Sequence, residues 1–182
     1  LPALLGPSGS GKTTLLRFLA GLGTPTTGDV AIDGQVINRV KPQDRGIGFV
    51  FQDYALFRYL TVYDNIAFGL RTQHWSEDKI KARVDQLLAV TGLTALAQRY
   101  PNQLSGGQKQ RVAFVRSFAP TPKVLFLDEP FAALDTQIPQ ELSGWLKQVI
   151  HHMGITSIFV SHAHNEPTDI RVYIDVMNAA IE

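Results

Sequence analysis

The stretch Gly6-Pro-Ser-Gly-Ser-Gly-Lys-Thr13 lies between two apolar segments, Leu1–Leu5 and Leu15–Leu19, and it decides the fold. It matches the pattern G-x-x-x-x-G-K-[ST] of a phosphate-binding loop. The glycines allow a turn so tight that successive N–H groups point into one concavity, which suits an anion. A helix expected from Lys12 would add its free N–H groups and the positive end of its dipole. We therefore predict a nucleotide site. The predicted contacts are Gly6, Pro7, Ser8, Gly9, Ser10, Gly11, Lys12, Thr13 and Thr14.

Two side chains of this stretch carry specific roles. Lys12 would bridge the β- and γ-phosphates, and the Thr13 hydroxyl would ligate Mg²⁺. A glycine turn before a helix can also arise by chance. The order of strand, loop and helix favours the nucleotide site over that alternative.

The composition indicates one domain and excludes several classes. With 182 residues and 45% hydrophobic content, the chain is large enough for a core. The net charge of +1 and the scattered Lys and Arg residues argue against a nucleic-acid partner. The absence of cysteine excludes disulfides and fits a reducing compartment. No apolar run approaches the length of a membrane span and no signal peptide opens the chain, so we expect a soluble chain that would serve a membrane only by docking.

Strand and helix patterns alternate along most of the chain. We expect strands at Ala3–Leu5, 46–51, Val124–Leu127, Thr156–Val160 and Val172–Met177, and a hairpin around Asp33-Gly34. We expect helices from Lys12 to about Gly21, from Gly106 to Phe118 and from Ile138 to Met153. This alternation predicts an α/β fold with a mainly parallel sheet and helices on both faces.

The character changes to short helical pieces between about residues 53 and 118, where we expect a helical subdomain. Thr61 and Asp64 have the spacing of a capping box that opens a helix. In the next helix, Glu77 and Asp78 stand in the first turn, and the apolar residues fall on one face as a core stripe. The residues of that stripe are Ile80, Val84, Leu87 and Leu88.

Further motifs narrow the chemistry. Residues 104–113 read Leu-Ser-Gly-Gly-Gln-Lys-Gln-Arg-Val-Ala, and the glycine pair at a helix start is a second anion site. The apolar strand before Asp128 and Glu129 delivers two carboxylates at its end. One carboxylate can hold Mg²⁺ through water, and the other can orient or deprotonate an attacking water.

Together these motifs resemble the ATP-binding subunits of ABC transporters, which contain a P-loop NTPase fold. The phosphate loop, Gln52, the 104–108 signature, Asp128-Glu129, Asp135 and His162 stand in the family order. The resemblance implies that Gln52 reaches Mg²⁺ and the attacking water, that Asp128 holds Mg²⁺ through water, and that Glu129 acts as the base. It also implies that His162 contacts the γ-phosphate of ATP.

The resemblance further implies partners. Two such subunits sandwich two ATP molecules head to tail, so that Ser105, Gly106, Gly107 and Gln108 would complete the partner's site and Asp135 would lie at the seam. ATP would close the dimer, hydrolysis would open it, and the motion would pass to transmembrane permease subunits. A solute-binding protein would take part indirectly. The implied location is the cytoplasmic face of the inner or plasma membrane, or the equivalent stromal face in a plastid.

The stretch from Gln52 to Leu70 is similar to that of importers, and most similar to the sulfate/thiosulfate group. Importers for molybdate, iron, polyamines and sugars share much of it. A soluble ABC-type ATPase of DNA repair or translation is disfavoured by this stretch and by the lack of an inserted coiled coil.

Several features depart from the family pattern. The chain opens at the strand that feeds the phosphate loop and stops at Glu182, so we expect one domain over residues 1–182 in which early strands and any C-terminal regulatory domain are absent. Ala163 replaces the usual acidic residue, and Pro167 enters the following helix. The alternative function is therefore a truncated or degenerate copy with weak or no turnover.

Overall fold

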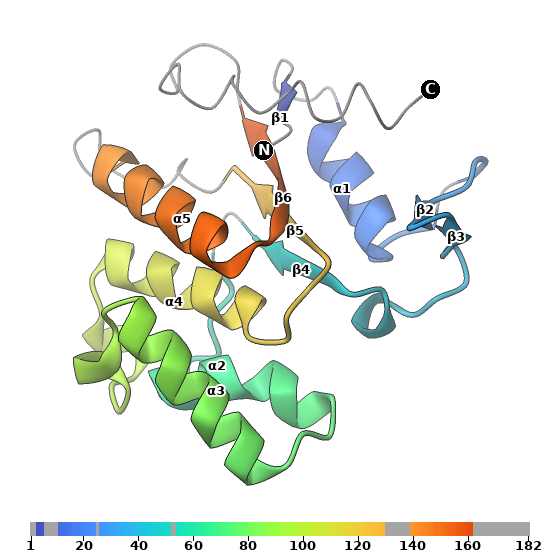
Figure 1. The fold of residues 1–182 in the computed structure, drawn as a ribbon. Helices are drawn as coiled ribbons and strands as arrows, with labels where there is room; N and C mark the ends of the chain where they lie inside the picture. The colour runs from blue at the N-terminus through green and yellow to red at the C-terminus, as the bar shows by residue number, and fades with distance from the viewer. Residues whose placement is uncertain (1–2, 6–10, 25, 52–53, 130–138, 162–182) are drawn as a thin grey trace.

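The computed structural model describes residues 3–5, 11–24, 26–51, 54–129 and 139–161. A four-stranded sheet lies at its centre, in the order β1 (Ala3–Leu5), β6 (Thr156–Ser161), β5 (Val124–Asp128) and β4 (Ile47–Val50). Every neighbouring pair is parallel, so the carboxyl ends of all four strands meet at one edge (Figure 1). The predicted parallel sheet is confirmed, while the strand expected at 172–177 lies outside the described residues.

Helices cover both faces of this sheet, as predicted. Strand β5 is apolar from Val124 to Leu127 and ends in Asp128, and its alternate side chains point to opposite faces. Leu125 and Leu127 pack with α4 (Gly106–Phe118) and α5 (Pro139–Met153) on one face. Phe126 packs with α1 (Lys12–Ala20) on the other face (Figure 1). A strand buried on both faces reads as a continuous apolar run, which is why it was recognisable from sequence.

The predicted hairpin joins β2 (Ala31–Ile32) to β3 (Gln35–Val36). The two turn residues, Asp33 and Gly34, have φ of 52° and 74°. Both lie in the left-handed region that two-residue hairpin turns require, and Asp-Gly is a preferred pair there. A short 3-10 helix, η1 (Pro42–Asp44), connects the hairpin to β4.

A helical layer packs below the sheet in Figure 1 and contains α2 (Val62–Thr72), α3 (Glu77–Val90) and two 3-10 turns, η2 (Thr94–Leu96) and η3 (Pro101–Gln103). Its core includes the whole predicted stripe of α3, in which no side chain is more than 2% exposed. Within the part of the chain that the structure describes, no helix is both long and apolar enough to cross a membrane.

Helix α4 is shared between the two layers. Val112 and Val115 belong to the core of the helical layer, whereas Phe114 and Phe118 belong to the core of the sheet. All four side chains are completely buried. Because α4 packs on both sides, a displacement of this helix necessarily affects both cores.

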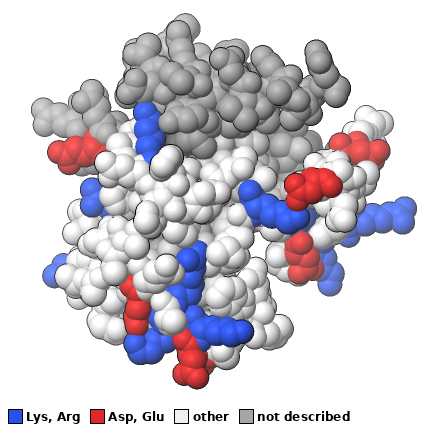
Figure 2. All heavy atoms as spheres, in the orientation of Figure 1, with Lys and Arg blue, Asp and Glu red and all other residues white. Residues whose placement is uncertain are grey.

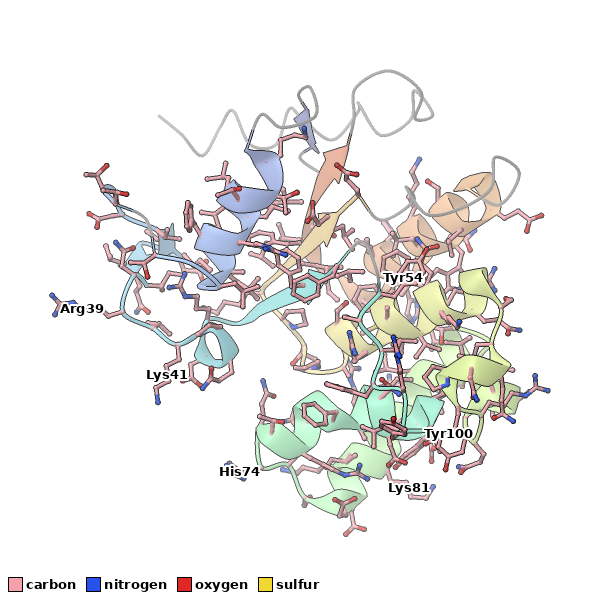
Figure 3. The ribbon with its side chains drawn as sticks, turned by 180° about the vertical axis from the view of Figure 1, so that it is seen from behind. Arg39, Lys41, Tyr54, His74, Lys81 and Tyr100 are labelled. Carbon is pink, nitrogen blue, oxygen red and sulfur yellow. The ribbon has the colours of Figure 1, made fainter. Side chains whose placement is uncertain are left out.

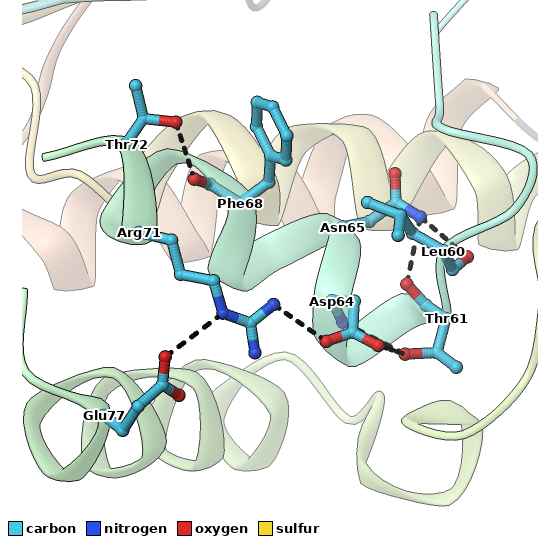
Figure 4. A network of polar contacts seen from close by, with 8 residues as sticks. All are labelled: Leu60, Thr61, Asp64, Asn65, Phe68, Arg71, Thr72 and Glu77. Carbon is cyan, nitrogen blue, oxygen red and sulfur yellow. Dashed lines mark hydrogen bonds and ion pairs between the residues drawn. The ribbon is translucent and has the colours of Figure 1, made fainter. Parts of the chain in front are cut away.

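The N-terminus of α2 carries a polar network (Figure 4). The Thr61 hydroxyl accepts a hydrogen bond from the Asp64 N–H (3.1 Å) and donates one to the Asp64 carboxylate (2.8 Å). The predicted N-cap is therefore present. In a capping box the carboxylate would accept from the backbone N–H of Thr61, whereas here it accepts from the Thr61 hydroxyl. Arg71 bridges Asp64 (2.9 Å) and Glu77 (3.4 Å), which joins α2 to α3.

The Asp64 carboxyl responds to this network. Partial burial raises its pKa, but the hydrogen bonds from Arg71 and Thr61 outweigh burial, and the net pKa lies below its ordinary value. A lowered pKa contributes stability at neutral pH, and this contribution is lost as the pH falls through the pKa. The residues are partly exposed, so the effect is small.

Asn65 is a buried polar residue in the first turn of α2, and its side chain binds the loop that precedes the helix. Its amide nitrogen lies within 3.1 Å of the carbonyl oxygens of Phe57, Leu60 and Thr61, and its amide oxygen accepts from the Phe57 N–H (2.9 Å). Its side chain is fully buried. One side chain therefore shapes residues 57–61.

Asn65→Ala is expected to lower the free energy of unfolding by about 3 kcal/mol, because the fully buried side chain loses its four hydrogen bonds to backbone groups at once. Urea denaturation followed by circular dichroism measures the change. Asn102→Ala, at an exposed position, is the matched control and should change stability by less than about 0.5 kcal/mol. Equal stability of the two variants would contradict the role of Asn65.

Candidate nucleotide-binding site

Helix α1 begins at the carboxyl edge of the sheet (Figure 1). Its N-cap, Gly11, has φ of 90°, a conformation that disfavours any residue with a Cβ. The cap has no side-chain hydrogen bond, and the first turn contains no acidic residue. No capping side chain of Gly11 competes with an anion for the first-turn N–H groups, and the helix dipole favours an anion there. Of the predicted loop, residues Gly6–Ser10 lie outside the described residues.

Lys12 stands in the first turn of α1 and is only 7% exposed. Lysine is rarely buried to this degree without a partner or a ligand for its charge. The neighbouring Thr14 is exposed at the same end of the helix. The Lys12 ammonium and the helix dipole both place positive charge at this end of α1.

Thr13 and Asp128 come together across 115 residues of sequence. The Thr13 Oγ1 donates a hydrogen bond of 2.9 Å to Asp128 Oδ1, and Asp128 is 6% exposed. Two oxygen donors at this spacing suit Mg²⁺, which prefers hard ligands and is usually held by one or two protein groups together with phosphates and water. Among the described residues no cluster of three or more His, Cys, Asp and Glu is present. Binding of Mg²⁺ by one or two protein groups together with phosphates and water needs no such cluster. The residues therefore fit Mg²⁺.

Glu129 follows Asp128 directly at the end of β5. Its φ of 46° places it in the left-handed region, which costs free energy for a residue with a side chain. Strained residues of this kind concentrate at functional sites, where the surrounding structure holds them.

Two further predicted residues follow neighbouring strands in the sequence. Strand β4 ends at Val50, two residues before Gln52, and β6 ends at Ser161, one residue before His162. The register pairs Val50 with Leu127 and Asp128 with Val160, so these strand ends lie level with Asp128. Gln52, Asp135 and His162 themselves lie outside the described residues.

The second predicted anion site is at the start of α4. Ser105 is its N-cap and forms a capping box with Gln108: the Ser105 Oγ accepts from the Gln108 N–H (3.3 Å), and the Ser105 N–H donates to Gln108 Oε1 (3.0 Å). Ser105 and Gly106 are exposed. The Ser-x-x-Gln spacing is a sequence signal for this box. Helix α4 covers the face opposite α1, so the signature and Lys12 stand on different sides of the sheet (Figure 1).

A large groove lies beside the segment that follows Gln52. Its volume is about 900 Å³, and its lining includes Tyr54, Leu56, Tyr59, Tyr100 and Lys109. Tyr59 is 93% exposed. The Tyr54 hydroxyl is buried without a hydrogen-bond partner among the described residues, and burial raises the Tyr54 pKa. Figure 3 shows Tyr54 at the junction of sheet and helical layer and Tyr100 on the helical layer.

On the face drawn in Figure 2, the charges of the described residues carry no single sign over a large area. On the face in Figure 2, acidic and basic side chains are interspersed. This arrangement follows from the balanced composition, with 17 basic and 16 acidic residues.

Comparison with known proteins identifies the class. Residues 1–132 match the ABC transporter family, and the chain belongs to that family. The fold is similar to that of the ATP-binding cassette MJ0796, solved as a dimer in a post-hydrolysis state with ADP and Pi. The TM-score is 0.74 and the identity 35%, with 89% of this chain and 74% of that chain covered. The predicted α/β P-loop NTPase fold is confirmed.

More similar sequences carry a narrower description. The chain is 53% identical over 178 residues to the sulfate/thiosulfate import ATP-binding protein CysA of Mycobacterium tuberculosis, covering 98% of this chain and 51% of the relative. It is 52% identical over 180 residues to the protein of the same name in Escherichia coli K12, covering 97% and 49%. The chain spans about half the length of the curated relatives it matches. These findings confirm the predicted resemblance.

Proposed function

We propose that this protein binds Mg-ATP at the N-terminus of α1 and hydrolyses it to energise import of sulfate or thiosulfate through partner permease subunits. The contact between Thr13 and Asp128 is the observation that carries the proposal, because it joins the first turn of α1 to a carboxylate at the end of β5. The names of the relatives support the import function and the solute.

Each residue has a definite task in this proposal. Lys12, Thr14, residues 6–11 and the first-turn N–H groups bind the phosphates. Thr13, Gln52 and, through water, Asp128 would hold Mg²⁺, and the bound ion would supply neutralisation of the negative charge that develops on the phosphates. Glu129 accepts a proton from the attacking water while the γ-phosphoryl group passes to that water and ADP leaves. His162 contacts the γ-phosphate.

The proposed active form is a head-to-tail dimer. Because α1 and α4 lie on opposite faces of the sheet, the residues Ser105–Gln108 stand away from the chain's own Lys12 and are free to meet the nucleotide of a second subunit. The dimeric structural relative with bound ADP and Pi supports this arrangement. Asp135 would lie at the seam between the subunits.

The groove beside Tyr54 is the proposed docking place of the permease. It combines aromatic and apolar side chains with the basic Lys109, and one wall follows Gln52 directly in the sequence. A permease segment in this groove would reach both the segment after Gln52 and α4, which starts with the signature. A solute-binding protein would act through the permease.

The proposed location is the cytoplasmic face of the bacterial inner or plasma membrane. The relatives named above are bacterial, so they give a plastid location no support. The alternative of a truncated or degenerate copy with weak turnover is consistent with Ala163 and Pro167, but it is not favoured, because Lys12, Thr13, Asp128 and Glu129 are all retained.

Uptake of labelled sulfate tests the proposed function. The protein is expressed in a bacterium that lacks its own sulfate-import ATPase subunit but keeps the permease. We expect sulfate uptake to return with this protein and not with its Glu129→Gln variant. Restored uptake of molybdate without sulfate would contradict the proposed solute, and no restored uptake of any anion would contradict the import function.

Asp128→Asn is expected to weaken Mg²⁺ binding to the ATP complex about tenfold or more, because a carboxylate that orders the metal's water shell is replaced by a neutral amide. Titration with Mn²⁺ followed by electron paramagnetic resonance measures this affinity. Asp33→Asn is the matched control, because Asp33 is an exposed carboxylate that pairs with Lys123. Equal Mn²⁺ affinity of the two variants would contradict the metal role of Asp128.

A further inference from the structure

Arg116 of α4 binds residues 54–57, which form one wall of the groove beside Tyr54. Its Nη1 donates to the carbonyl of Ala55 (2.8 Å) and its Nη2 donates to the carbonyl of Tyr54 (3.1 Å). The guanidinium carbon lies 5.3 Å from the ring centroid of Phe57, within range of a cation–π contact. Three of the four residues 54–57 therefore touch one side chain. Arg116 is half-buried, and this burial lowers its pKa.

The two residues whose carbonyls Arg116 binds are in a strained backbone conformation. Tyr54 and Ala55 have φ of 63° and 43°, in the left-handed region that residues with a Cβ disfavour. Two consecutive residues of this kind persist only where their surroundings hold them. Both carbonyls meet the two ends of a single guanidinium fork, which is planar and rigid. The fork of Arg116 is thus well suited to hold this turn.

The contact between Arg116 and residues 54–57 also links the groove to α4, the helix that starts with the signature. Residues Tyr54 and Leu56 line the groove, and so does Lys109, which stands on α4. The same helix begins at Gly106, immediately after the N-cap Ser105, and its 13 residues extend over about 20 Å. Arg116 lies near the opposite end of the helix from Ser105.

We infer that Arg116 is a positioning residue that fixes the groove wall 54–57 on α4, so that the groove and the signature at the start of α4 move as one unit. The contacts of Arg116 are independent of the proposed function, whereas their consequence for turnover rests on it. Asn65 holds Phe57 from the side of α2, so the effect of Arg116 should be greatest at Tyr54 and Ala55.

Hydrogen–deuterium exchange of the full-length protein tests the inference. The Tyr54 N–H donates to the carbonyl of Phe51 (3.0 Å), so its protection reports on the turn. We expect Arg116→Met to raise exchange of this amide tenfold or more. Arg116→Lys keeps the charge without the fork and should give an intermediate value, which also serves if the Met variant does not fold.

Arg83→Met is the matched control. Arg83 also donates to carbonyls, those of Phe118 and Ala119 at the end of α4, and burial lowers its pKa too. It does not reach residues 54–57, so its loss should change Tyr54 exchange less than twofold. Unchanged Tyr54 exchange in both Arg116 variants, or an equal rise in Arg83→Met, would overturn the inference.

Turnover distinguishes positioning from general destabilisation. With permease subunits present, we expect Arg116→Met to lower kcat about tenfold and to leave the ATP dissociation constant within twofold, while Arg83→Met keeps kcat. A loss of ATP affinity equal to the loss of kcat would overturn the positioning role. Absence of turnover in the wild-type protein would contradict the proposed function alone, because the exchange comparison needs no turnover.

Discussion

Glu129→Gln is expected to lower ATP hydrolysis at least a hundredfold while ATP binding is retained. Glutamine keeps the shape of the side chain but cannot accept a proton from water, and loss of a general base typically costs on the order of 10²–10⁴-fold. The position of Glu129 at the end of β5, directly after Asp128, supports this role. Release of inorganic phosphate measures turnover, and calorimetry measures binding.

The same variant should accumulate as a closed dimer with ATP, because hydrolysis is the step that opens it. Size-exclusion chromatography with and without ATP reports this state. Glu141→Gln, which changes an exposed carboxylate in the first turn of α5, is the control and should keep wild-type turnover. Near-wild-type hydrolysis by Glu129→Gln, in a preparation free of contaminating ATPase, would rule out Glu129 as the base.

Lys12→Ala is expected to weaken Mg-ATP binding about a hundredfold, because charge-assisted hydrogen bonds to two phosphates are lost, each worth about 1.5–3 kcal/mol. Lys12 is buried at the N-terminus of α1, where no other residue of the first turn is basic. Calorimetry gives the dissociation constants.

Arg17→Ala is the matched control for Lys12→Ala. It removes one positive charge from the same helix, at an exposed position in the last turn. Its dissociation constant for Mg-ATP should stay within about twofold of the wild-type value, because exposed charges at this separation are screened. Indistinguishable affinities for Lys12→Ala and the wild-type protein would contradict the phosphate role.

Local patterns in the sequence predicted much of the fold. The helix Gly106–Phe118 has the predicted bounds, and β1, β4, β5 and β6 lie within a residue or two of the predicted strands. These elements are recognisable because buried strands form apolar runs and helices repeat their apolar residues every three to four positions. The meeting of Thr13 and Asp128 then follows from parallel strands, whose carboxyl ends share one edge.

No pattern in the sequence predicted the contacts that Asn65 and Arg116 make with the backbone. Their acceptors are backbone carbonyls, which every residue type provides, so no pairing of side chains in the sequence marks them. The left-handed turn at Tyr54 and Ala55 was also hidden, because neither residue is glycine, asparagine or aspartate. The roles assigned to Gln52, Asp135 and His162, and the limits of a helical subdomain at 53–118, stay predictions.

A mixture of two inactive variants tests the composite ATP site most directly. Lys12→Ala removes the phosphate contact, and Gly107→Asp places a negative charge in the signature, where an acidic residue still suits the first turn of α4. Each variant alone should show almost no phosphate release. Mixed in equal amounts, they should recover up to about a quarter of wild-type turnover, because half of the dimers are mixed and each mixed dimer has one intact site. A mixture as inactive as either variant alone would contradict a site shared between two subunits.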